Sequence, residues 1–250
     1  MTDWTLRPTW EDRLKDILVP PRLYYWLRAH RERCRGEREI ALLPFLVDPD
    51  RAAVDVGANK GVYTYWLEHR ATHVHAYEPN PKMFAVLQKS VGNSPKVTLR
   101  HIAASDQAGE AVLHIPRGSR GFSNQGGSLK LSKRQREPER EHAEVRVEAK
   151  RLDDENLSNI GFMKIDVEGF EFEVLAGAEL IIQRDHPVLL IEMEERHSGI
   201  SNAEGVARVE ALGYDAFFLT GKGVLTSFAR YAPPKPGEAY INNFIFLPKG

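Results

Sequence analysis

The chain has 250 residues, 42% hydrophobic and 28% charged, which is enough to bury the core of one α/β domain with a small N-terminal appendage. Its formal net charge of -1 excludes a global attraction for nucleic acid, and its single cysteine, Cys34, excludes an internal disulfide. No apolar run reaches the roughly 18 residues of a membrane span, and the N-terminus has no signal-peptide pattern. We therefore expect a cytoplasmic protein with no nucleic-acid partner and no transmembrane segment.

Residues 1–44 predict an N-terminal helical segment that precedes the main domain of residues 45–250. Leu14, Ile17 and Leu18 share one face of a first helix, and Pro20 and Pro21 interrupt it. The second helix alternates aromatic and apolar residues with arginines. It could make peripheral contact with a membrane or with an anionic substrate carrier. The alternative is a helix that packs its apolar side on the domain and leaves its arginines in water.

The segment Ala52–Gly61, AAVDVGANKG, predicts a buried strand that ends at Asp55 and Val56 and breaks into a glycine turn before a helix. Gly57 and Gly61 allow the backbone to turn and to approach a ligand closely, and Asn59 tolerates a left-handed conformation. The following helix would direct its free N–H groups towards the turn, where they attract carboxylate or phosphate. An ordinary βα turn without a ligand is the alternative.

A second strand over residues 72–77 ends at Glu78, which Pro79 and Asn80 follow. Glu78 follows Asp55 at close to the approximately 20 residues that place an acid on a ribose in nucleoside-binding α/β folds. A helix is predicted over residues 82–90 and a third strand over residues 97–104. The small residues at the end of that strand, Ala104 and Ser105, leave room for a flat base. Asp106 would either bond the base or cap the next turn.

Residues 109–154 break the alternation of strands and helices. Two extended segments, 111–115 and 145–149, flank a polar insertion at about 116–144. Ten basic and five acidic residues lie between Arg117 and Arg151. This insertion could form a lid over the site or contact an anionic substrate. The alternative is a solvated surface loop.

Two later strands end in acidic residues. The strand over residues 162–165 ends at Asp166 and Glu168, and the strand over residues 187–191 ends at Glu192, with His197 a little further on. Because ligands bind at the carboxyl ends of strands in open α/β sheets, we expect these four side chains to lie near each other. A helix over residues 202–212 and extended segments at 214–219 and 243–247 complete the chain, the two segments forming a closing hairpin at the sheet edge.

The ordered motifs DVGANKG, YEPNP, VEAKRLDD, FMKIDVEGFEFEVLAGA and PVLLIEME resemble those of the FkbM family of S-adenosylmethionine-dependent methyltransferases, over roughly residues 45–248. The resemblance implies a Rossmann-like α/β fold with a mostly parallel seven-stranded sheet, a reversed final strand and helices on both faces. It also implies methyl transfer to an oxygen of a sugar, glycan or secondary metabolite. The expected cofactor site is divided into three parts: Asp55, Gly57, Ala58, Asn59 and Gly61 around the methionine; Glu78, Pro79 and Asn80 around the ribose; and Ala104, Ser105 and Asp106 around the adenine.

Methyl transfer to a hydroxyl requires alignment of oxygen, methyl and sulfur, and removal of one proton. Asp166 is the first candidate for base or orienter, and also a candidate cofactor contact, with Glu168, Glu192 and His197 after it. A divalent ion held by Asp166, Glu168 and Glu192 could instead acidify the hydroxyl, although we predict no metal.

Other functions are compatible with a Rossmann-like sheet. A nicotinamide-dependent oxidoreductase would share it, but the turn lacks the third glycine of G-x-G-x-x-G. A base-directed amino methyltransferase would carry Asn or Asp followed by Pro-Pro-aromatic, which does not occur. A non-catalytic nucleoside-binding module would tolerate replacement of the strand-end acids.

Overall fold

The structure is a computed structural model that describes residues 20–118, 121–122, 127–129, 142–233 and 240–250. The first expected helix, with Leu14, Ile17 and Leu18, and most of the basic insertion lie outside these ranges. The helices are α2 (Pro21–Arg35), η1 (Arg38–Leu42), α3 (Leu43–Leu46), α4 (Val62–Glu68), α5 (Pro81–Val91), η2 (Leu152–Asp154), α6 (Glu171–Ala176), α7 (Glu179–Asp185), α8 (Glu195–Ser198), α9 (Asn202–Glu210) and η3 (Phe228–Arg230).

The main sheet has the strand order β11-β10-β12-β9-β8-β1-β2-β3. Its five strands from β9 to β3 are parallel, and β12 runs antiparallel to both β9 and β10. The strands of the main sheet are β1 (Ala52–Val56), β2 (Val74–Tyr77), β3 (Val97–Arg100), β8 (Ile160–Ile165), β9 (Val188–Glu192), β10 (Tyr214–Leu219), β11 (Leu225–Ser227) and β12 (Asn243–Pro248).

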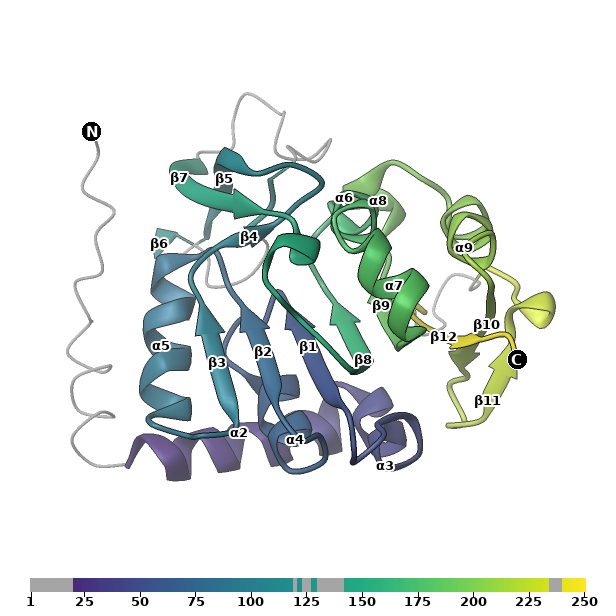
Figure 1. Cartoon of the computed structure of the whole chain (residues 1–250), viewed down its shortest axis with the longest axis horizontal. Helices are drawn as coiled ribbons and strands as arrows, with labels where there is room; N and C mark the ends of the chain where they lie inside the picture. The colour runs from purple at the N-terminus through teal and green to yellow at the C-terminus, as the bar shows by residue number, and fades with distance from the viewer. Residues whose placement is uncertain (1–19, 119–120, 123–126, 130–141, 234–239) are drawn as a thin grey trace.

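This sheet confirms the expected mostly parallel fold with a reversed final strand. The strand count is eight because the short strand β11 adds to the edge beyond β10. The two segments expected to form a closing hairpin, β10 and β12, do pair antiparallel. They are not at the sheet edge as a hairpin, because β11 lies between them in the chain and occupies the edge, while β12 lies between β9 and β10. Helices α6, α7 and α9 share a core with one face of the sheet, and α2, α3 and α4 share a core with the other (Figure 1).

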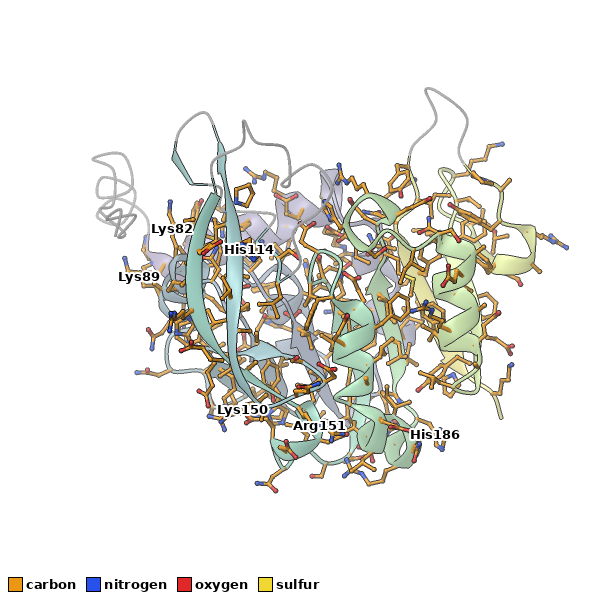
Figure 2. All side chains as sticks on the ribbon, turned by 90° about the horizontal axis from the view of Figure 1, so that it is seen from above. Lys82, Lys89, His114, Lys150, Arg151 and His186 are labelled. Atoms are coloured by element: carbon orange, nitrogen blue, oxygen red, sulfur yellow. The ribbon has the colours of Figure 1, made fainter. Side chains whose placement is uncertain are left out.

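A second, four-stranded sheet of order β4-β7-β5-β6 lies above the β3 side of the main sheet (Figure 1). Its strands are β4 (Ala103–Ala104), β5 (Gly109–Gly118), β6 (Gly121–Phe122) and β7 (His142–Lys150). The two extended segments expected around the insertion are β5 and β7, which pair antiparallel. Lys150 and Arg151, labelled in Figure 2, mark the point where β7 returns to the main domain.

The prediction of one continuous third strand over residues 97–104 is wrong. The strand breaks at residues 101–102, so that β3 pairs with β2 in the main sheet while β4 pairs in parallel with β7. The break lets Ile102 and Ala104 join the core of one face of the main sheet while Ala103 joins the separate core of the second sheet. Periodicity could not reveal it, because both pieces are extended and the sequence does not show that each pairs with a different strand.

Candidate cofactor and methyl-transfer site

A cleft of about 410 Å³ opens at the carboxyl ends of β1, β2, β8 and β9. This volume lies within the range of roughly 300–1,000 Å³ that is usual for small-molecule sites. Residues that line it come from segments far apart in the chain, among them Gly57, Glu78, Asp166 and Glu192. The parallel strands end together here, which is why the fold places its ligand site at this edge.

The glycine turn is held rigidly against the neighbouring strands. Gly57 and Gly61 have φ angles of 80° and 84°, and Asn59 has 49°, so all three occupy the left-handed region. The N–H groups of Gly57 and Ala58 both donate to the carbonyl of Tyr77 at 3.0 Å. A Cβ on Gly57 would lie 1.8 Å from the carbonyl oxygen of Asp166. The end of β1 and the end of β8 are therefore in direct backbone contact.

Asp55 and Glu78 are buried carboxyl groups on neighbouring strands of the cleft. Asp55 accepts a hydrogen bond of 2.6 Å from the Thr64 hydroxyl. The two oxygens of Glu78 accept one backbone hydrogen bond each, both 2.7 Å long, from Asn59 and Asn80. Burial raises the pKa of Asp55 to about 6 and that of Glu78 to about 7. Glu78 thus ties the two loops together and still has lone pairs that could accept hydrogen bonds from a pair of hydroxyls.

The predicted ribose and adenine residues are only partly in the cleft. Pro79, Asn80 and Ala104 line it, and the Asn80 side chain also caps α5 by accepting from the N–H groups of Lys82 and Met83. Ser105 and Asp106 are not among the lining residues, and the Ser105 hydroxyl donates to Asp106 at 3.0 Å. The contacts of Ala104, Ser105 and Asp106 with an adenine stay predictions.

The acids at the ends of β8 and β9 lie in the cleft together with a lysine that the sequence reasoning missed. Lys164 Nζ lies 3.7 Å from Asp166 Oδ2, and the Lys164 side chain is 2% exposed. Glu192 Oε1 accepts a short hydrogen bond from Asn242. Burial and the neighbouring charge of Asp166 raise the pKa of Glu192 to about 9. Lys164 was overlooked because a lysine between apolar strand residues carries no ligand signal of its own.

Glu168 and His197 form a second group with Glu194. The Nδ1 atom of His197 makes a short contact with Glu168 and lies 3.6 Å from Glu194 Oε2. The hydrogen bond with Glu168 raises the pKa of His197. Glu168 and Glu194 line the cleft, whereas His197 is not among its lining residues. Glu194 lies in the sequence between β9 and α8, next to Glu195. The sequence alone did not show which of these two adjacent glutamates lies in the cleft.

No metal is assigned to this second group. Ligand atoms of Glu168, Glu194 and His197 lie within 4.8 Å of each other, close enough for a divalent cation. Arg196 and Asn242 already bind Glu194, so the described contacts account for this carboxylate without an ion. In the described part of the chain, Asp166, Glu168 and Glu192 do not form a comparable three-residue group.

The helix α2 forms part of the rim of the cleft. Arg28 and Arg31 from this helix line it together with Lys60. Burial lowers the pKa of Lys60, and the nearby Arg28 lowers it further. Tyr25 and Ala29 of α2 are buried against the domain, whereas Trp26, like Leu23, Tyr24 and Leu27, is exposed. Within the described residues, no helix is long and apolar enough to cross a membrane.

The fold is that of the α/β methyltransferases. A crystal structure of methyltransferase FkbM from Methylobacillus flagellatus KT superposes with a TM-score of 0.51 and 16% identity, over 80% of this chain and 44% of that chain. The family model described as "Methyltransferase FkbM domain" matches residues 55–216. The chain belongs to this family, as its sequence motifs predicted.

Two curated relatives are modestly similar. 2-O-methyltransferase NoeI of Sinorhizobium fredii is 28% identical over 171 residues, which are 61% of this chain and 64% of the relative. The 31-O-demethyl-FK506 methyltransferase FkbM of Streptomyces tacrolimicus is 30% identical over 161 residues, 52% of this chain and 60% of the relative. The chain thus spans about three fifths of the length of these relatives.

Proposed function

We propose that this protein is an S-adenosylmethionine-dependent methyltransferase that methylates a hydroxyl oxygen of a small molecule, sugar or glycan. The observation that carries the proposal is the cleft at the carboxyl ends of β1, β2 and β8, in which the glycine turn, Glu78 and Asp166 meet. Family membership supports the choice of cofactor, and the names of two relatives specify O-methylation.

The residues of the cleft fit the proposed cofactor. Gly57, Ala58, Asn59 and Lys60 of the turn line the cleft, whereas Gly61 does not. Glu78 can accept from both ribose hydroxyls. The buried Oδ1 atom of Asn59 has no hydrogen-bond partner among the described residues, so it is free to accept from a ligand. A nearby carboxylate, Asp55, favours a ligand that carries positive charge. When bound, S-adenosylmethionine would supply an electrophilic methyl group.

The chain's own contribution would be orientation and proton removal. Attack by the acceptor oxygen forms a carbon–oxygen bond as the carbon–sulfur bond breaks, and the hydroxyl proton must leave. Asp166 lines the cleft and is one third exposed, so an acceptor can reach it. We assign Asp166 the role of base or orienter; Glu168, Glu192 and His197 remain secondary candidates. Correct placement of both partners in a closed site can contribute roughly 7–11 kcal/mol to lowering a barrier.

The test has two stages. Calorimetric titration should show that S-adenosylhomocysteine binds and NAD does not; binding of NAD alone would support the oxidoreductase alternative and refute the assignment. A panel of hydroxylated sugars, glycans and polyketides is then incubated with labelled S-adenosylmethionine, and products are mapped by mass spectrometry. We expect an O-methylated product with the wild-type protein.

The variant Asp166→Ala separates the enzyme from a binding module. It should retain S-adenosylhomocysteine affinity within about threefold and lose most turnover of the acceptor found in the panel. Full turnover by this variant would remove Asp166 from the mechanism. Cofactor binding with no product on any acceptor would favour the non-catalytic nucleoside-binding module.

A further inference from the structure

One face of the main sheet changes from apolar to charged at its carboxyl end. Lys164 on β8 pairs in register with Asp55 on β1 and with Leu190 on β9, so these side chains share a face. Two residues further along β8 and β9, Asp166 and Glu192 extend the same face into the cleft. Lys164 is the only basic residue among these four ionisable side chains.

The ammonium group of Lys164 has no hydrogen-bond partner in the described part of the chain, although the residue is only 1% exposed. Its nearest charged neighbour is Asp166 at 3.7 Å, and the centroid of the Tyr63 ring lies 5.2 Å from Nζ. A buried ammonium group without compensation is strongly unfavourable. The surrounding carboxyl groups must therefore balance it.

The charged groups around Lys164 come from every element packed against it. They are Asp166 just after its own strand, Asp55 on β1, Glu192 on β9, Glu37 before η1 and Glu39 within η1; Tyr63 on α4 is a neutral phenol. Burial lowers the pKa of Lys164, but Asp166 and the other acids raise it more, so the net direction is upward. Conversely, Lys164 lowers the pKa values of Asp55 and Glu192, which burial raises to about 6 and about 9.

We propose that Lys164 is a positioning residue for the methyl-transfer site: its buried positive charge, 3.7 Å from Asp166 Oδ2, orients the Asp166 carboxyl group at the cleft and balances the carboxyl groups of Asp55 and Glu192. This inference rests on the proposed function. During transfer, the O–H bond of the acceptor breaks and its proton joins a carboxylate oxygen of Asp166. The electron pair of the breaking carbon–sulfur bond stays on sulfur.

The inference is tested by carbon-13 NMR titration of side-chain carboxyl groups in the protein without ligands. Asp55 and Glu192 are assigned with the variants Asp55→Asn and Glu192→Gln. In Lys164→Met we expect the titration midpoints of both groups to rise by about one pH unit or more, the scale of a lost opposite charge within about 6 Å. Lys164→Arg keeps the charge and should restore midpoints close to those of the wild type.

Lys249→Met is the matched control. Lys249 Nζ lies 3.8 Å from Asp215 Oδ1, nearly the same separation, but this pair is exposed and outside the cleft. Its removal should leave both midpoints unchanged. If Lys164→Met does not fold, Asp166→Asn gives an independent measurement: the midpoint of Lys164, followed at its ε-carbon, should fall because its nearest carboxylate is gone.

Two results would overturn the inference. Unchanged midpoints of Asp55 and Glu192 in folded Lys164→Met would leave Lys164 with a packing role only. A tenfold or larger loss of S-adenosylhomocysteine affinity with unchanged midpoints would place Lys164 in the cofactor site instead. Because the titration needs neither cofactor nor acceptor, its outcome is independent of whether the proposed function holds.

Discussion

The contact between the glycine turn and the end of β8 predicts that Gly57→Ala damages both stability and ligand binding. A non-glycine residue at a φ of 80° costs about 1–2 kcal/mol in backbone strain. The added Cβ would also lie 1.8 Å from the Asp166 carbonyl oxygen and 2.9 Å from its carbonyl carbon. Because both are backbone atoms, the strand end must move, and overpacking of this kind costs roughly 1–3 kcal/mol or more.

Gly213→Ala provides the matched control for the same backbone strain. Gly213 has a φ of 93°, and a Cβ there would meet no atom within 4 Å. It lies in the turn between α9 and β10, and it does not line the cleft. We therefore expect Gly213→Ala to lose about 1–2 kcal/mol of stability, and Gly57→Ala about 2–5 kcal/mol.

Urea unfolding measures the two stabilities, and calorimetry measures S-adenosylhomocysteine binding. Gly57→Ala should bind at least about tenfold more weakly, since displacement of Asp166 deforms the turn, whereas Gly213→Ala should bind as the wild type does. If the two variants lose equal stability and both keep full affinity, the direct backbone contact between β1 and β8 has been misjudged.

Three other expectations follow from the described contacts. In Glu78→Gln, a single side-chain carbonyl oxygen faces the two backbone donors of Asn59 and Asn80. The affinity for S-adenosylhomocysteine, measured by calorimetry, should therefore fall about 10- to 100-fold. An unchanged dissociation constant would show that Glu78 does not bind the ribose. Asp153→Ala removes an acceptor for the Leu180 and Ile181 N–H groups at the start of α7 and should cost about 1–2 kcal/mol in urea unfolding without changing ligand affinity; reduced affinity would contradict the separation of α7 from the cleft. Burial raises the pKa of Glu78 to about 7 and of Glu192 to about 9, and a raised folded-state pKa contributes stability that is lost as pH rises through it. The melting temperature should therefore fall by several degrees between pH 6.5 and 9. Burial lowers the pKa of His75 to about 4, so His75 makes the protein more stable as pH rises, but this effect is complete below that range. Glu192→Gln should show a smaller fall, and an equal fall in wild type and variant would refute the role of Glu192.

The sequence alone determined the local features of this protein. The strand, the turn at Gly57 and the helix from Val62 follow from neighbouring residues, because small and β-branched side chains favour a buried strand and glycine permits a positive φ. The placement of Glu78 and Asp166 at strand ends also follows, since parallel strands end at a common edge. The resemblance of the ordered motifs to the family predicted how these elements combine into a fold, and the structure confirms that fold.

Only the tertiary structure decided which of these residues meet. The break after Arg100 occurs because Ala103 and Ala104 pair with β7, a partner almost fifty residues away. Lys164 is a functional candidate because three strands surround it with carboxyl groups, a relation between distant segments that the sequence around it does not contain. Burial has the same origin: Glu78 and Glu192 have raised pKa values because distant segments exclude water from them.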